Sequence, residues 1–111
     1  EEWLSFFLRG VSEVSREAFE TIGKIVRLRE RHRRVITESL GRVSGNGLKV
    51  LESLYTHPVM SVEAVRKITG TSYPAANNLV SKLVEQGILI ETTGRRRHRR
   101  YRYDAYVELF S

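Results

Sequence analysis

The second half of the chain follows an order of elements that few folds share. Its apolar spacing predicts a helix from Leu48 to the His57-Pro58 pair, a second from Val62 to Ile68, and a third from Tyr73 to Gln86. Two short strands then flank an arginine-rich turn. Three helices followed by a hairpin form the order of a winged helix-turn-helix. The sequence therefore predicts a mainly α chain whose residues 43–111 form a winged helix-turn-helix domain with a small β-hairpin wing.

Capping and turn residues mark the ends of these helices. Pro58 excludes the α conformation at His57 and stops the first helix there. Ser61 and Ser72 are suited to cap the second and third helices through their hydroxyl oxygens. Gly70 is suited to close the second helix in the left-handed region, where a glycine carries no steric penalty. These signals predict a helix, a tight turn and a second helix in direct succession.

The hairpin that follows carries the densest positive charge in the chain. Ile88-Leu89-Ile90 predicts its first strand, and its return strand places Tyr101 and Tyr103 on one side. Between the strands lies the run Gly94-Arg95-Arg96-Arg97-His98-Arg99-Arg100. After the hairpin we expect Asp104 to cap a last short helix over residues 105–110.

Net charge points to the same class of partner as the hairpin does. The formal charge is +6 and the isoelectric point is near 10.1, which favours polyanions because bound phosphates release condensed counterions. Charge alone leaves DNA, RNA and an acidic membrane open. The apolar opening of the chain is shorter than the roughly 20 residues that a membrane span needs, and Glu1-Glu2 is not the basic flank of a signal peptide. We expect a soluble, cytoplasmic protein that does not bind membranes.

The third helix has a face that suits the reading of base edges. Ala76, Leu79, Val80 and Leu83 share one side, which predicts a buried face. Its other side carries small and amide groups, and an asparagine can bond two atoms of an adenine edge. An ordinary solvated face is the alternative. We predict that the nucleic-acid-binding residues are Thr71, Ser72, Tyr73, Asn77, Asn78, Ser81, Lys82, Arg95, Arg96, Arg97, His98, Arg99 and Arg100.

Residues 1–42 predict a long helical arm. An apolar seam recurs at spacings of three, four and seven through Leu4, Leu8, Val11, Ala18, Ile22, Ile25, His32 and Ile36. Gly10 and Gly23 leave open whether the arm is one helix or two. Unbroken, it would extend about 60 Å, too far for a small domain to cover. We expect a joint at Gly41 to Gly47, with Ser44 or Asn46 capping the next helix.

The arm would expose an apolar stripe that needs a partner. A second copy of the chain and a preceding domain are both plausible occupants, and the third possibility is that the stripe is core of the C-terminal domain. A basic run, Lys24, Arg27, Arg29, Arg31, Arg33 and Arg34, also lies in the arm. The run predicts a solvated surface, and the alternative is that its arginines contact phosphate groups.

Side chains for metal or covalent chemistry are sparse. The chain has no cysteine, which excludes disulfides and thiolate metal sites. Its three histidines, His32, His57 and His98, fall in different predicted elements. We therefore expect no catalytic residue, no metal site and no cofactor.

Four stretches of the chain resemble the C-terminal part of Fic-family proteins. They are Trp3-Leu4-Ser5-Phe6-Phe7-Leu8-Arg9-Gly10-Val11, Leu28-Arg29-Glu30-Arg31-His32-Arg33, Gly70-Thr71-Ser72-Tyr73-Pro74-Ala75-Ala76-Asn77 and Leu83-Val84-Glu85-Gln86-Gly87-Ile88-Leu89. The resemblance covers almost the whole chain. It implies that residues 1–42 are the end of a helical Fic core with its linker, and that a winged helix follows.

The same resemblance raises an enzyme hypothesis that the residues do not support. Fic catalysis uses a His-Pro-Phe loop running into Gly-Asn-Gly-Arg, with the histidine as base. Here His57-Pro58 is followed by Val59, and Gly45-Asn46-Gly47 precedes it and runs into Leu48. The resemblance implies a longer parent that transfers AMP to a protein hydroxyl, while this chain is not an enzyme. Two roles stay open: a regulatory DNA-binding module, paired through its N-terminal helices or docked on a Fic domain, and a protein-interaction module that positions or selects substrates for that domain.

Overall fold

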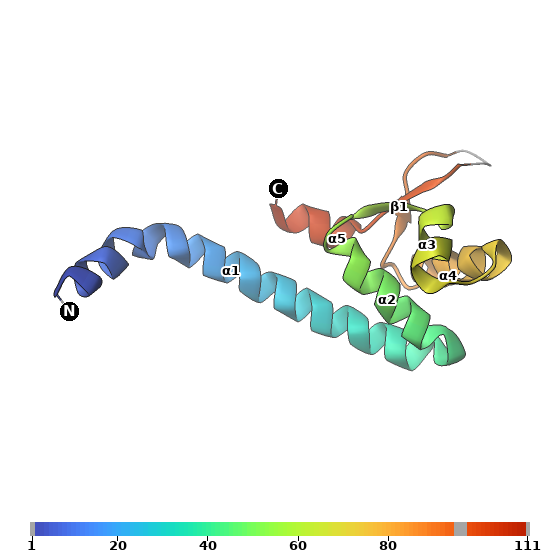
Figure 1. Cartoon of the computed structure of the whole chain (residues 1–111), viewed down its shortest axis with the longest axis horizontal. Helices are drawn as coiled ribbons and strands as arrows, with labels where there is room; N and C mark the ends of the chain where they lie inside the picture. Colours follow the sequence, from blue (N-terminus) through green and yellow to red (C-terminus); the bar gives the residue numbers. More distant parts are fainter. Residues whose placement is uncertain (1, 95–97, 111) are drawn as a thin grey trace.

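A long helix and a small helical domain with a three-stranded sheet make up the described part of the chain. The computed structural model describes residues 2–94 and 98–110, with side chains from Arg16 onward within those ranges. Helix α1 runs unbroken over Glu2–Ser39. It extends away from the domain, as Figure 1 shows, and the described chain measures 60 Å along its longest axis. The arm is therefore one helix, and Gly10 and Gly23 do not divide it.

The domain has the element order that the sequence predicts. After a 3-10 turn η1 (Gly41–Val43), the chain forms α2 (Ser44–Leu54), β1 (Val59–Ser61), α3 (Val62–Thr69), α4 (Tyr73–Glu85), β2 (Ile90–Glu91), β3 (Arg100–Arg102), α5 (Asp104–Val107) and η2 (Glu108–Phe110). Helices α3 and α4 pack closely around the turn between them. The fold is mainly α, a helical arm followed by a winged helix-turn-helix with a small hairpin.

The caps predicted for α3 and α4 are confirmed. Ser61 Oγ accepts the Ala64 N–H at 3.2 Å, and Ser72 Oγ accepts the Ala75 N–H at 3.3 Å. Gly70 lies at a φ of 67°, in the left-handed region, and its N–H bonds the carbonyl of Arg66. These local bonds fix the turn that sets the direction of α4 relative to α3.

The three strands form one antiparallel sheet in the order β1-β3-β2. Tyr101 lies opposite Met60 on one side and Glu91 on the other. The sequence prediction of a strand beginning at Ile88 is wrong in extent, because the N–H groups of Ile88 and Leu89 both bond the carbonyl of Leu83. Those two residues close the end of α4 and are buried, so strand pairing begins only at Ile90.

The core lies between the end of α1 and the helices and sheet of the domain. Its buried apolar residues are Leu28, Ile36, Leu40, Val50, Leu51, Leu54, Met60, Val62, Val65, Ala76, Leu79, Val80, Leu83, Ile88, Leu89, Tyr101 and Tyr103. The buried face predicted for α4 is confirmed in full. The arm shares this core, because Leu28 and Ile36 belong to α1 and Leu40 follows its last residue.

The predicted joint from Gly41 to Gly47 is mostly helix. Turn η1 leads directly into α2, whose first residue is Ser44, and no side chain caps that helix. Gly47 is buried within α2, where an added Cβ would lie 2.9 Å from both Ile36 Cγ2 and Leu40 Cδ2. Gly47 therefore does not mark a break between helices. Because it has no side chain, α2 can approach α1 closely.

The C-terminal turn differs from the prediction in its cap. Asp104 is the first residue of α5, which has no side-chain cap, and its Oδ1 instead lies 2.7 Å from Arg102 Nη2. Tyr106 and Leu109 pack against the core, as expected, while Phe110 contacts the Tyr106 ring edge-on and stays largely exposed. Within the described residues, no helix combines the length and apolar character needed to cross a membrane.

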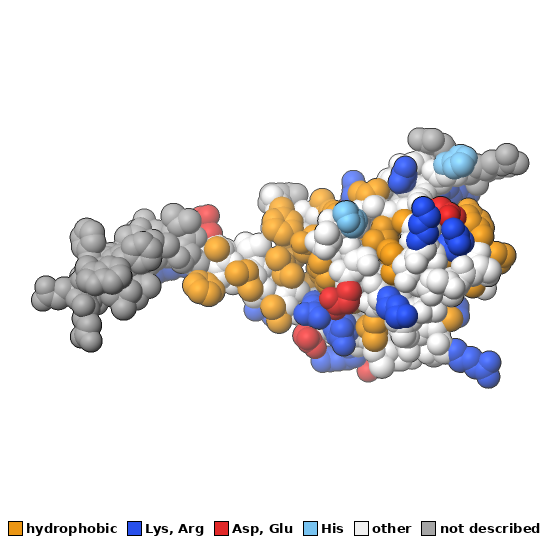
Figure 2. Space-filling model, viewed as in Figure 1, with side chains coloured by type: hydrophobic (Ala, Val, Ile, Leu, Met, Phe, Trp, Pro, Cys, Tyr) orange, Lys and Arg blue, Asp and Glu red, His pale blue; other side chains and the backbone are white. Residues whose placement is uncertain are grey.

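The apolar seam of α1 is divided between core and surface. Its part near the domain is buried, including His32 at 8% exposure. Farther out, Phe19 is 72% exposed, Ile22 53% and Val26 51%, and Figure 2 shows hydrophobic side chains along the described part of the arm. Among the described side chains, the explanation of the seam as core of the domain therefore holds from Leu28 onward, and Leu4, Leu8 and Val11 lie outside the described side chains.

Candidate nucleic-acid interface

Helix α4 presents four distinct sides. One is buried in the core, as described above. Tyr73 and Asn77, four residues apart, share a second side, and Asn78 and Ser81 lie on the outer face. Lys82, nine residues after Tyr73, lies on the flank opposite to it at about 100° per residue. All five of these polar or aromatic side chains are exposed, but they do not face a single direction.

The first two predicted contact residues have structural partners in the turn. Ser72 caps α4, as described above. Thr71 Oγ1 lies 2.7 Å from Thr69 Oγ1, which in turn donates to the carbonyl of Val65. These hydroxyls stabilise the turn between α3 and α4, so their partners account for their presence without a ligand.

The base of the wing is organised by one carboxylate. Glu91 Oε2 accepts the Thr93 N–H at 2.6 Å and the Gly94 N–H at 2.7 Å. Its Oε1 lies 3.5 Å from Arg99 Nε. The Gly94 N–H, followed by the Thr93 N–H and the Arg99 charge, lowers the pKa of Glu91, because all three favour the ionised form. Glu91 thereby fixes the chain where it leaves β2.

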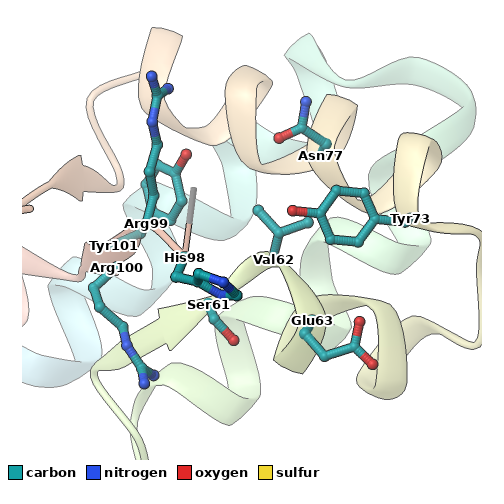
Figure 3. Close-up of a pocket in the computed structure, with 9 residues that line it drawn as sticks. All are labelled: Ser61, Val62, Glu63, Tyr73, Asn77, His98, Arg99, Arg100 and Tyr101. Carbon is teal, nitrogen blue, oxygen red and sulfur yellow. The ribbon is translucent and has the colours of Figure 1, made fainter. Parts of the chain in front are cut away.

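The wing and α4 meet across an open cleft. It has a volume of about 820 Å³ and is lined by Ser61, Val62, Glu63, Tyr73, Asn77, His98, Arg99, Arg100 and Tyr101. Figure 3 shows Tyr73 and Asn77 on one wall, from α4, and His98, Arg99 and Arg100 on the other, from the wing. Of the predicted contact residues, the cleft therefore brings together Tyr73, Asn77, His98, Arg99 and Arg100.

The cations of the cleft differ in how far acidic groups neutralise them. Arg99 pairs with Glu91, as described above. Arg100 is exposed, and its guanidinium has no carboxylate partner among the described residues. Its backbone is held, since the Arg100 carbonyl accepts the Thr92 N–H at 3.0 Å. Arg100 thus offers a charge on a fixed stretch of backbone.

Sequence reasoning missed the floor of the cleft. Ser61, Val62 and Glu63 come from β1 and the first turn of α3, and they reach the wing because Ser61 lies opposite Arg100 in the sheet. Only the strand register shows this proximity. The predicted residues Arg95, Arg96 and Arg97 lie outside the described residues.

The basic run of the arm lies on the surface. Arg29 Nη2 and Arg33 Nη1 lie 2.8 and 3.2 Å from Glu52 Oε1 on α2, so two of its arginines tie the arm to the domain. Both pairs are about half exposed and contribute little stability.

Within the described residues, no group of three or more histidine, cysteine or acidic side chains is placed to hold a metal ion.

Comparisons of the chain with protein families, curated proteins and solved structures gave no match.

Proposed function

We propose that this chain is a DNA-binding winged-helix module with a regulatory role. Helix α4 enters the major groove, and the wing lies on the phosphate backbone beside it. The observation that carries the proposal is the cleft, because its two walls are the amide-bearing side of α4 and the cationic base of the wing. Two elements that contact a duplex in different ways are held on one surface.

The outer face of α4 supports base contacts. The side chains of Asn77, Asn78 and Ser81 are exposed and form no hydrogen bond with other described residues. An amide that is not used inside the protein is available for the edge of a base. Lys82, on the other flank, would contact the DNA backbone on the far side of the helix.

The resemblance to Fic-family proteins extends this proposal to a longer parent protein. The module would be the C-terminal part of a protein adenylyltransferase whose catalytic motif lies outside this chain. A cytoplasmic location and a role in transcription regulation accord with such a module.

A second candidate function is supported by the exposed stripe of α1. Phe19, Ile22 and Val26 form an apolar surface that a protein partner would cover. That partner is a second copy of the chain, which would give a homodimer reading two half-sites, or a Fic domain, in which case the module positions or selects substrates. The homodimer would keep the DNA-binding function, whereas docking on a Fic domain would give a function that does not need duplex DNA.

Duplex affinity measured by fluorescence anisotropy at several salt concentrations tests the proposal. We expect steep salt dependence, and Arg100→Ala should reduce the slope by about one unit, as for one lost phosphate contact. Arg42→Ala, which removes an exposed cation from η1 at the α1–α2 junction, is the matched control and should leave the slope unchanged. Flat salt dependence would favour the protein-partner function.

Base reading needs a separate measurement. Asn78→Ala should reduce the preference among duplex sequences while leaving the salt slope as it is, because an edge contact contributes about 1 to 3 kcal/mol of discrimination. An equal loss of affinity on every sequence would show that Asn78 does not read bases.

A further inference from the structure

The cleft contains a carboxylate that would oppose the ligand proposed for it. Glu63 lines the same cleft as Arg100 and Tyr73, and its side chain is about half exposed. A phosphate bound in the cleft would share it with this negative charge. At separations of a few ångströms, a like charge repels even in water. A site for phosphate at this position therefore needs Glu63 to be neutralised.

Arg66 supplies that neutralisation from the next turn of α3. Its Nε lies 3.1 and 3.0 Å from the two carboxylate oxygens of Glu63, and its Nη2 lies 2.5 Å from Oε1. Such a two-pronged pair orients both side chains. The same pair lowers the pKa of Glu63, chiefly through the Arg66 hydrogen bond, so the carboxylate stays ionised but paired.

The pair is poorly suited to a purely structural role. Both side chains are more than a third exposed, and exposed ion pairs on a helix contribute little to folding stability. Arg66 itself is not among the residues that line the cleft. The position of the pair is what distinguishes it, since Glu63 lines the cleft and Arg66 bonds the Glu63 carboxylate from outside the cleft.

The remaining charges of the cleft then favour a single anion. Arg99 is paired with Glu91, and Arg66 offsets Glu63. Arg100 is left as the lining cation without a carboxylate partner among the described residues, and the Tyr73 hydroxyl points into the cleft from the wall formed by α4, where it is available as a hydrogen-bond donor. This arrangement matches one phosphate with a net charge of one.

We propose that the cleft seats one backbone phosphate of the duplex between Tyr73 and Arg100, and that Arg66 is a positioning residue which keeps Glu63 from repelling it. The inference rests on the proposed function. Arg66 affects DNA without touching it, because its effect passes through the carboxylate of Glu63. It follows that the two side chains are coupled in DNA binding.

A double-mutant cycle on the full chain tests this coupling. Anisotropy titrations with a fluorescent duplex should show Arg66→Gln binding about three- to fivefold more weakly, the size of one close charge repulsion in water. Glu63→Gln should stay within about twofold of the original affinity, because Arg66 already offsets the carboxylate that is removed. The double variant should match Glu63→Gln, since Arg66→Gln has no effect once the carboxylate is gone. Lys67→Gln is the matched control, since it removes an equal charge from the neighbouring exposed position without a hydrogen bond to Glu63, and it should lose less than Arg66→Gln.

Each other outcome overturns the inference. A loss in Arg66→Gln that persists in the double variant would mean that Arg66 contacts DNA itself or supports the fold, and thermal melting of each variant separates those two causes. Equal losses in Arg66→Gln and Lys67→Gln, or no loss in either, would also overturn the inference. The proposed function would still stand in these cases, provided that the unchanged chain binds the duplex. Poly-glutamate, a polyanion without phosphate groups, serves as a second probe. If the unchanged chain binds it and binds no duplex, the proposed function fails and the inference fails with it.

Discussion

His32 Nδ1 on the arm lies 2.5 Å from the hydroxyl oxygen of Tyr103, just after β3. The two residues are 71 positions apart and both are buried. Tyr103 also lies 3.4 Å, hydroxyl to hydroxyl, from Tyr55 just after α2, and its ring stacks on Tyr106 of α5. This hydrogen bond joins the arm to the end of the wing, so the orientation of one is tied to the position of the other.

Removing one partner of this bond should destabilise the fold. We expect Tyr103→Phe to lower the free energy of unfolding by about 1 to 3 kcal/mol, because the buried imidazole nitrogen loses its partner. In a His32→Phe background the same change should have a smaller effect. Urea unfolding checks both values. Tyr101→Phe is the control, since no hydrogen bond of its hydroxyl is seen among the described residues, and equal losses from the two tyrosines would contradict the explanation.

Stability should depend on pH through the same histidine. Burial, and secondly the charge of Arg31, lowers the pKa of His32 from its ordinary 6.5. Below pH 6.5 the unfolded chain therefore binds a proton that the folded chain resists, so stability is full above this pH and falls as the pH decreases toward the folded-state pKa. Urea midpoints measured between pH 8 and about pH 5 should show this fall, and His32→Phe should reduce it. An unchanged pH profile in that variant would exclude His32 as its source.

Two glycines of α2 should respond to alanine in opposite directions. Gly47→Ala places a methyl group 2.9 Å from side-chain atoms of Ile36 and Leu40, and such overpacking costs about 1 to 3 kcal/mol. At Gly45 an added Cβ meets nothing within 4 Å, so Gly45→Ala should stabilise the chain by about 0.5 kcal/mol through a less flexible unfolded state. Thermal or urea unfolding compares them. Similar effects of the two substitutions would show that α1 and α2 do not approach closely at Gly47.

The exposed stripe of the arm should govern self-association if a second copy covers it. Sedimentation equilibrium of the full chain should then show a dimer, and Phe19→Glu should dissociate it because a charge would be buried at the contact. Lys24→Glu, on the opposite side of the helix from Ile22, should leave the dimer intact. A monomer at all concentrations would instead direct attention to a different protein as the occupant.

Sequence reasoning succeeded where the signal is local. Ser61, Ser72 and Gly70 act on backbone groups within four residues, so their roles are readable without a tertiary structure. The buried face of α4 likewise follows from spacing alone. Asp104 carries a similar local signal but fails as a cap, because its carboxylate is held by Arg102.

The failures involve residues whose partners are distant in the chain. Gly47 looks like a loop residue until Ile36 of α1 and Leu40, which follows that helix, are placed beside it. Glu63 is an ordinary first-turn acid until the sheet register brings the wing to the same place. His32 appeared only as a member of the apolar seam, and its partner Tyr103 lies in another element. The roles of these three residues depend on contacts between distant parts of the chain, and the spacing of apolar residues along the sequence does not reveal such contacts.

The central position of β3 limits how the hairpin can move. Because β3 is bonded on one edge to β1 and on the other to β2, moving the hairpin as a whole would break two ladders at once. Strand β1 continues without a loop into α3. A load on β3 would therefore pass through the β1–β3 ladder to β1 and from there, along continuous backbone, into the helix that precedes α4.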